Sequence, residues 1–368
     1  MRRSWQKTLI LLVALVVIGA LLYGLRGSVH YAGFSWTKLG QAVRGADIKL
    51  LLLSLVTIYV CYWIRGLRWV RLSRHLGPAG VWSVYAATLM GFLAIVLFGR
   101  AGEPVRPLLI GRRENLPMSA MFGIYAVERL LDIAVTILMT GWSLVYLPGL
   151  LRAREGDHPS AATAALLPKL QTAGFTLFAL LAVAVVFLVH LRATRGAALV
   201  RVAERWRDAA GWRKRAAGML AGFLDGLQAL RTWGDLAVAI GLTAAHWALV
   251  LAIYCWVPQS FGGSLASFSM RDAVLTLACT MLGSTVQLPG IGGGSWVGSF
   301  LAMTLFLKIA NEPAMAAAVT LWLITFVGCS IAGVPLLLRE GMSLGDLRRI
   351  ASEKDAAAAS TAPARGIH

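Results

Sequence analysis

Long apolar runs dominate this sequence, and they restrict the chain to very few kinds of fold. Runs such as 8–25, 170–191, 235–257 and 313–338 are long enough to cross a membrane, because about 17–25 residues span the hydrocarbon core as a helix. Inside lipid, the backbone polar groups have to be satisfied within the protein, and a helix satisfies its own. We therefore predict an all-α polytopic membrane protein in which residues 1–340 form a single integral membrane domain.

Two other apolar stretches are interrupted by glycine and proline. Residues 81–98 end at Gly-Arg-Ala-Gly-Glu-Pro, and a Leu-Pro-Gly-Ile-Gly-Gly-Gly-Ser segment separates 271–287 from 296–309. Irregular backbone at membrane depth is tolerated only in a protein interior or along a cavity, and broken helices in both halves of a transporter mark its binding site. We expect about six full transmembrane helices plus two broken, re-entrant elements in an inverted-repeat arrangement. The expected full spans are 8–25, 49–64, 118–146, 170–191, 235–257 and 313–338.

The distribution of positive charge decides between two topologies. If every apolar run crossed the membrane, the basic segment 192–234 would lie opposite the basic N-terminus, against the positive-inside rule. If the broken elements each enter and leave on one side, 25 Lys and Arg fall in the inside segments and six in the outside loops. We therefore expect cytoplasmic termini, an amphipathic cytoplasmic segment at 192–234 and a disordered tail at 341–368.

Composition limits which partners and cofactors we expect for this chain. The net charge of +18 would suggest nucleic acid for a soluble protein, but here the basic residues lie between apolar runs. We expect membrane lipids as partners, no nucleic acid, and the plasma membrane of a prokaryote as the location; a homo-oligomer remains an open alternative. The cysteines lie inside apolar segments without metal-ligand spacing, so neither zinc nor another cofactor is expected.

The stretch 99–132 concentrates ionisable residues in an otherwise apolar sequence. They are Arg100, Glu103, Arg106, Glu128, Arg129 and Asp132. A charge at the centre of a spanning helix costs about 2.5–3.5 kcal/mol, so such residues usually pair with one another and line a pathway. We predict that these six residues form one substrate-binding site inside the membrane, with Arg106 within salt-bridge reach of Glu128 or Glu103. The alternative is a solvated cytoplasmic loop, with Glu128 and Arg129 at the membrane surface.

The second break offers a complementary anion site. A helix that begins there would point free N–H groups and its positive dipole end at an anion, and Ser295 is a candidate N-cap. The residues predicted to contribute are Gln287, Pro289, Gly290, Gly292, Gly293 and Ser295. The alternative is close helix packing through small residues.

Two other features have less specific interpretations. Arg65, Arg68, Arg71 and Arg74 are spaced three residues apart, which favours either a helical face against anionic head groups or a plain topology-setting basic loop. The lone His246 lies in an apolar run, and it is more simply interpreted as a hydrogen-bonded core residue than as a functional one.

The two broken elements resemble a known family. The run GRAGEPVRPLLIGRR followed by AVERLLD, and the later QLPGIGGG before a final apolar helix, are similar to the signatures of the lysylphosphatidylglycerol synthase/flippase transmembrane-region family. The resemblance covers roughly residues 8–340. Trp296 stands about where many members have an acidic residue, so we expect a divergent subfamily with another lipid.

The resemblance implies a membrane domain with inverted, re-entrant elements that moves a lipid between leaflets. In the bifunctional members, a soluble acyltransferase-like domain follows and makes the aminoacyl lipid, and we expect that synthase activity to be absent here. The leading hypothesis is translocation of an anionic or phosphate-bearing lipid, polyprenyl-phosphate-linked lipids included. The alternatives are a non-catalytic partner that presents a lipid-linked precursor, and an intramembrane head-group enzyme using Glu103, Glu128, Asp132 and His246.

Overall fold

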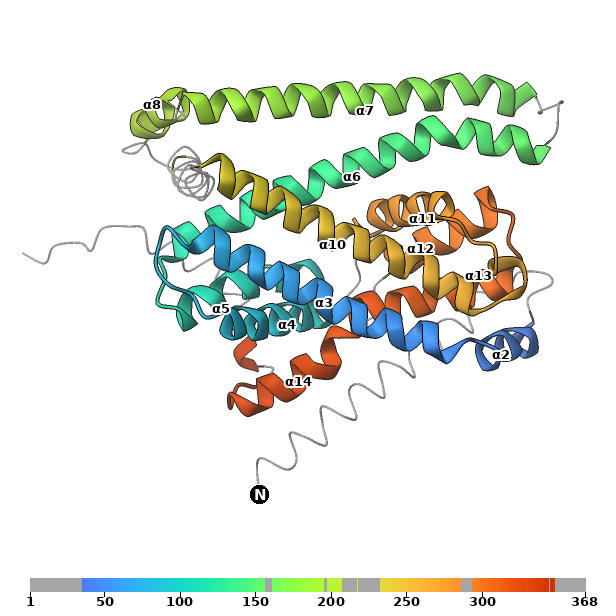
Figure 1. The fold of residues 1–368 in the computed structure, drawn as a ribbon, viewed down its shortest axis with the longest axis horizontal. Helices are drawn as coiled ribbons and strands as arrows, with labels where there is room; N and C mark the ends of the chain where they lie inside the picture. The colour runs from blue at the N-terminus through green and yellow to red at the C-terminus, as the bar shows by residue number, and fades with distance from the viewer. Residues whose placement is uncertain are drawn as a thin grey trace, which may run out of the picture.

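The computed structural model describes residues 35–155, 161–194, 197–206, 217, 232–285, 293–343 and 345–347 (Figure 1). Within these ranges the regular secondary structure consists of helices, joined by turns and irregular segments, with no strand. The elements are α2 (Trp36–Arg44), α3 (Ile48–Ser73), α4 (Val81–Phe98), η1 (Gly99–Gly102), α5 (Val105–Arg113), α6 (Met118–Glu155), α7 (Ala161–Ala193), α8 (Ala197–Trp206), α10 (Trp233–Ser260), η3 (Gly263–Leu265), α11 (Met270–Gly283), α12 (Gly294–Leu301), η4 (Ala302–Phe306), α13 (Asn311–Trp322), η5 (Leu323–Val327) and α14 (Cys329–Arg339).

The all-α polytopic fold is confirmed. Among the described residues, six helices are long and apolar enough to cross a membrane. They are Ile48–Ser73, Val81–Phe98, Ala120–Gly149, Leu167–Phe187, Trp233–Ser260 and Asn311–Arg339. This set includes Val81–Phe98, which the sequence analysis assigned to a broken element. The predicted first span at 8–25 lies outside the described residues, as do much of 192–234 and the tail from residue 348.

Helices α3 and α10 form an antiparallel pair (Figure 1). At one end the Asp47 N–H donates to the Ser260 carbonyl at 2.7 Å. At the other end Arg71 pairs with Asp235 at 3.1 Å. Because the start of α3 meets the end of α10, the segments that follow these two helices begin at opposite ends of the pair.

Each of those following segments is a helical hairpin closed by glycines. In the first, a side chain at Gly91 of α4 would meet the Cβ of Arg106 on α5, and Gly102 lies against the Ala94 carbonyl. In the second, Gly283 of α11 lies against the Gly294 carbonyl of α12, and Gly298 against that of Cys279. Small residues let backbones approach closely. Close packing of this kind occurs at Gly283, before the second glycine-rich segment, and at Gly298, after it.

The two halves repeat the same order of parts. Helix α3 leads into the hairpin α4–α5 and then α6; helix α10 leads into the hairpin α11–α12 and then α13. The first hairpin packs on α14 of the second half, and the second hairpin packs on α6 of the first half. Each hairpin therefore packs on a long helix of the other half.

The last spanning helix contains a π-helical turn that α3 stabilises. Residues Leu323–Val327 are π-helical, and such a turn interrupts the regular ladder of hydrogen bonds. The Tyr59 hydroxyl donates to the Gly328 carbonyl at 2.6 Å, and the Tyr62 hydroxyl donates to the Thr325 carbonyl at 2.9 Å. Two side chains of α3 therefore satisfy backbone acceptors at the bend between α13 and α14.

Several helix ends differ from the sequence prediction. Helix α3 continues to Ser73 instead of ending at residue 64. Helix α6 passes through Pro148, and α7 already contains Pro168, although the sequence analysis placed both prolines in a loop over 148–169. A single proline removes one hydrogen bond, and neighbouring helices can compensate for that loss in a membrane protein.

The first hairpin gives a direct test of the packing. Gly91→Ala would place a Cβ 2.5 Å from the Cβ of Arg106, so we expect it to lower the free energy of unfolding by about 1–3 kcal/mol, the usual cost of overpacking. Gly241→Ala on α10 is the matched control, since nothing lies within 4 Å of its added Cβ. Thermal unfolding of the purified variants measures both, and equal midpoints would contradict the hairpin packing.

Candidate functional site

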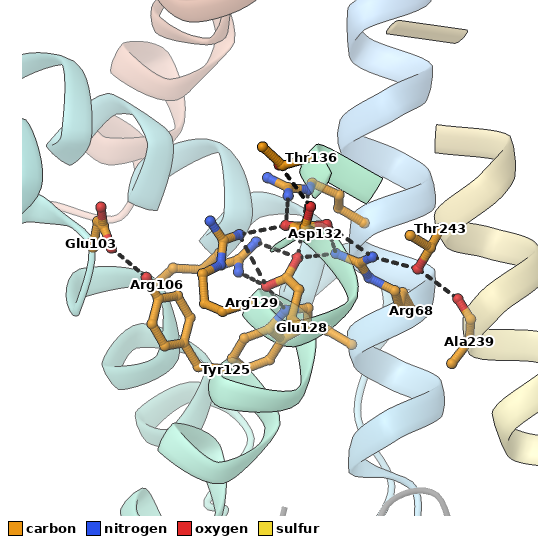
Figure 2. A network of polar contacts seen from close by, with 12 residues as sticks. Arg68, Glu103, Arg106, Tyr125, Glu128, Arg129, Asp132, Thr136, Ala239 and Thr243 are labelled. Atoms are coloured by element: carbon orange, nitrogen blue, oxygen red, sulfur yellow. Dashed lines mark hydrogen bonds and ion pairs between the residues drawn. The ribbon is translucent and has the colours of Figure 1, made fainter. Parts of the chain in front are cut away.

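Three helices bring charged side chains to one point (Figure 2). Helix α6 supplies Glu128, Arg129 and Asp132, helix α3 supplies Arg65, Arg68 and Trp69, and α5 supplies Arg106. Residues three or four apart on a helix share one face, so the spacing within α3 and α6 aims these groups at each other. We call these seven residues the charged cluster.

Glu128 is fully buried in the charged cluster, with 0% of its surface exposed. Arg68 Nη2 donates to Oε1 at 2.5 Å, and Trp69 Nε1 donates to Oε2 at 2.8 Å. Arg106 pairs with the same carboxylate through both terminal nitrogens, as a planar guanidinium fork can. A carboxylate removed from water is thus held by donors from two different helices.

Asp132, one turn further along α6, is also surrounded by guanidinium groups. Arg65 Nη2 lies 2.5 Å from Oδ2, and Arg129 Nη2 lies 2.9 Å from the same oxygen. Arg68 Nη2 lies 3.3 Å from Oδ1, so this arginine bridges the two carboxylates. The two acids and their arginines therefore form one network and not separate pairs.

Arg68 also ties the network to α10. Its Nη1 donates to the Thr243 hydroxyl at 2.7 Å, and that hydroxyl donates to the Ala239 carbonyl at 2.7 Å. Only 1% of Arg68 is exposed. The charged cluster therefore contacts α10 through the hydrogen bond of Arg68 to Thr243 (Figure 2).

Aromatic rings surround Arg106 on its other side. Its Cζ lies 4.8 Å from the ring centroid of Trp69, 5.8 Å from that of Phe92 and 5.9 Å from that of Tyr125. Ring faces attract a desolvated cation. The Tyr125 hydroxyl donates to Glu103 Oε2 at 2.5 Å, so Glu103 adjoins the charged cluster through this tyrosine.

The charged cluster has more positive than negative groups. Four guanidinium groups face two carboxylates, and Glu103 adds a third carboxylate at the edge. Among the described atoms, the Nε groups of Arg68 and Arg129 are buried without a hydrogen-bond partner, and the Nε of Arg65 has only a long ion-pair contact of 3.5 Å with Glu128 Oε1. Buried charges are costly unless they are paired and hydrogen-bonded, so the arrangement is suited to accept one more anionic acceptor.

The structure brings together most of the residues predicted from the first broken element. The predicted ion pair between Arg106 and Glu128 is present. Both residues are buried, with 4% of Arg106 exposed, so the alternative of a solvated loop is wrong for them. Arg129 pairs with Asp132. The backbone of Arg100 lies in η1, and its side chain lies outside the described part of the structure.

Sequence reasoning missed three members of the charged cluster. Arg65 and Arg68 are neither a head-group face nor a loop, because both are buried against α6. Trp69, fully buried, was not singled out at all. The sequence did contain a signal for this. Residues 64–73 include no proline and no two adjacent glycines, so the apolar helix could continue and carry its arginines into the protein interior. Arg71 pairs with Asp235, and Arg74 is exposed.

The second break is described only in part. Gln287, Pro289, Gly290 and Gly292 lie outside the described residues, so their predicted contact with the charged cluster stays a prediction. The sequence analysis named Ser295 as a candidate N-cap, but Ser295 is not the N-cap of α12. Gly293 takes that place with φ 57° and ψ −114°, a conformation that favours glycine. Ser295 is buried in the first turn of α12.

His246 is buried on α10 with its ring edge-on to Trp247, 5.3 Å between centroids. Its Nδ1 has no hydrogen-bond partner among the described atoms. Within the same described ranges, no group of three or more His, Cys, Asp or Glu is placed to hold a metal ion.

Comparison with known proteins gives one result. The sequence model of the family described as lysylphosphatidylglycerol synthase TM region matches residues 9–333. The comparisons with curated proteins and with solved structures give no match. The family match covers both hairpins, the charged cluster and all six long apolar helices up to residue 333. The chain therefore belongs to the lysylphosphatidylglycerol synthase transmembrane-region family, a family of membrane domains with a lipid-related function.

Proposed function

We propose that this protein moves an anionic or phosphate-bearing lipid between the two leaflets of the membrane, with the charged cluster as its head-group site. The observation that carries the proposal is the pairing of four arginines, three of them buried, with only two carboxylates on α6. Arginine binds phosphate through charge-assisted, often bidentate, hydrogen bonds. Charged groups inside a membrane domain are expensive and mark substrate pathways.

The carboxylates have a defined role in this proposal. When no lipid is bound, Glu128 and Asp132 neutralise most of the guanidinium charge and keep the arginines in place. A phosphate that enters competes for the same donors, starting with the less buried Arg129, whose side chain is 37% exposed. The acyl chains stay in the bilayer, so the protein has to shield only the head group.

The hairpins provide the means of alternating access. They begin at opposite ends of the α3–α10 pair, and each packs on the other half of the repeat. Rocking of one repeat against the other around a fixed site is the usual way in which such folds open to the two sides. We propose that the two hairpins are re-entrant, and that the glycines and Ser295 of the second one complete the head-group site.

Reconstitution tests the proposed function. Proteoliposomes that contain the purified full chain and an acyl-chain-labelled phosphatidylglycerol should lose leaflet asymmetry faster than protein-free vesicles, read out by dithionite quenching of the label. Vesicles that contain the Arg106→Lys variant are the matched control for a passive leak. A wild-type rate equal to that of protein-free vesicles, in either lipid direction, would contradict translocation.

The topology is a separate prediction. In a variant lacking the four native cysteines, single cysteines at Arg112 and Arg205 should be labelled from the cytoplasmic side, and one at Gly263 from the outside, because the positive-inside rule orients the chain. Impermeant thiol reagents applied to whole cells and to inside-out vesicles measure this. Labelling of position 112 from the outside would exclude a re-entrant first hairpin, because a helix α4 that crossed the membrane would carry this position to the outer side. Opposite sides for positions 112 and 205 would show that α6 and α7 do not both cross the membrane.

A further inference from the structure

The balance of charge around the site limits which lipid head groups can bind there favourably. Seven described ionisable side chains belong to one connected set of contacts. They are Arg65, Arg68, Arg106, Arg129, Glu103, Glu128 and Asp132. With four positive and three negative groups, the set has one unbalanced positive charge.

Burial makes this single charge important. Glu128, Arg68, Arg106, Arg65 and Asp132 are all buried, and charges interact more strongly where water is excluded. A head group with one negative charge brings the set to neutrality. A zwitterionic head group leaves the positive charge unbalanced, and a cationic one adds to it. A phosphomonoester with two negative charges gives the set a net negative charge.

We infer that the charged cluster, together with Glu103 at its edge, selects a lipid whose head group carries one negative charge and no positive charge, that is, a phosphodiester with an uncharged alcohol. This inference rests on the proposed head-group site. It excludes an aminoacylated, cationic head group as the preferred ligand, and also a phosphomonoester lipid.

Two residues at the edge of the set control this selection. Glu103 is only partly buried and Arg129 is 37% exposed at its side chain, and both contact Tyr125. Tyr125 accepts the guanidinium of Arg129 over its ring at 5.2 Å and donates its hydroxyl to Glu103. Because neither residue is enclosed, Glu103 can be replaced by glutamine, which has the same shape, and Arg129 by the shorter, uncharged glutamine, without leaving a fully buried partner unpaired.

The experiment measures thermal stabilisation of the purified full chain by short-chain lipids at pH 8. The probes are dihexanoyl phosphatidylglycerol, phosphatidylethanolamine, phosphatidic acid and lysylphosphatidylglycerol. Wild-type protein should bind the phosphatidylglycerol probe about tenfold more tightly than the other three. Glu103→Gln, which adds one positive charge, should shift the preference to phosphatidic acid. Arg129→Gln, which removes one, should abolish the preference for an anion, while Arg112→Gln on the exposed face of α5 should match the wild type.

The outcomes separate this inference from the proposed function. Equal or tighter binding of the zwitterionic, cationic or dianionic probe by wild-type protein would overturn the charge selection, even if vesicles show lipid movement. An unchanged preference in Glu103→Gln would overturn it as well. Selective binding of phosphatidylglycerol by a protein that moves no lipid in vesicles would support the selection and contradict translocation.

Discussion

Replacing Glu128 by alanine should lower the free energy of unfolding by about 3–5 kcal/mol, the usual cost of breaking a buried ion pair. The change removes the acceptor of Arg68, Arg106 and Trp69 together, and it leaves two buried guanidinium groups without their shared counter-charge. A large fall in the thermal unfolding midpoint of the detergent-purified protein measures this. Glu128→Gln keeps the shape and one acceptor oxygen, so it should be less destabilising than alanine.

The control for this prediction is an ion pair at the surface. Glu340 pairs with Arg113 at 2.6 Å, and about a quarter of each side chain is exposed. Exposed pairs contribute about 0–1 kcal/mol, so Glu340→Ala should change the midpoint little. If the two alanine variants unfold at the same temperature, Glu128 is not the buried centre of the network.

Arg106→Lys should reduce lipid movement by at least about tenfold while it preserves the fold better than Arg106→Ala. Lysine keeps the positive charge for Glu128 but loses the planar fork and most of the stacking on Trp69. Bidentate binding of a phosphate therefore fails, although the buried carboxylate keeps a counter-ion. The measurement is the rate of labelled phosphatidylglycerol movement in proteoliposomes, normalised to the amount of folded protein recovered.

Arg112→Lys is the matched control, because this arginine lies on the same helix and is exposed. Its lipid movement should equal that of the wild type. Equal loss in both variants would assign the effect to the loss of a guanidinium group anywhere on α5, and wild-type movement in Arg106→Lys would remove the bidentate phosphate from the account.

The pairing of Arg106 with Glu128 could be predicted because charge is expensive in an apolar sequence. The prediction needed only the cost of an unpaired charge and the spacing of Glu128 and Asp132 on one helix face. Glycine and proline inside apolar runs likewise predicted an interruption after residue 98, and the structure has α4 end there at Phe98. These predictions use local properties of the chain, which the sequence displays directly.

The rest of the charged cluster depends on tertiary contacts that no local pattern displays. Arginines three residues apart occur equally in an exposed basic helix, and only the packing of α3 against α6 and α10 places Arg65 and Arg68 inside. Ser295 has an N-cap side chain, but the positive φ of Gly293 starts the helix two residues earlier. Competing local signals of this kind are decided by the backbone path, which depends on the whole fold.

The central claim is that the charged cluster binds a phosphate head group. Native mass spectrometry of the purified protein with phosphatidylglycerol is the most direct test of this claim. The wild type and Arg112→Lys should each retain one bound phosphatidylglycerol under activation that strips the detergent, and Arg106→Lys should lose it. Retention of the same lipid by Arg106→Lys, at the same activation energy, would contradict the claim.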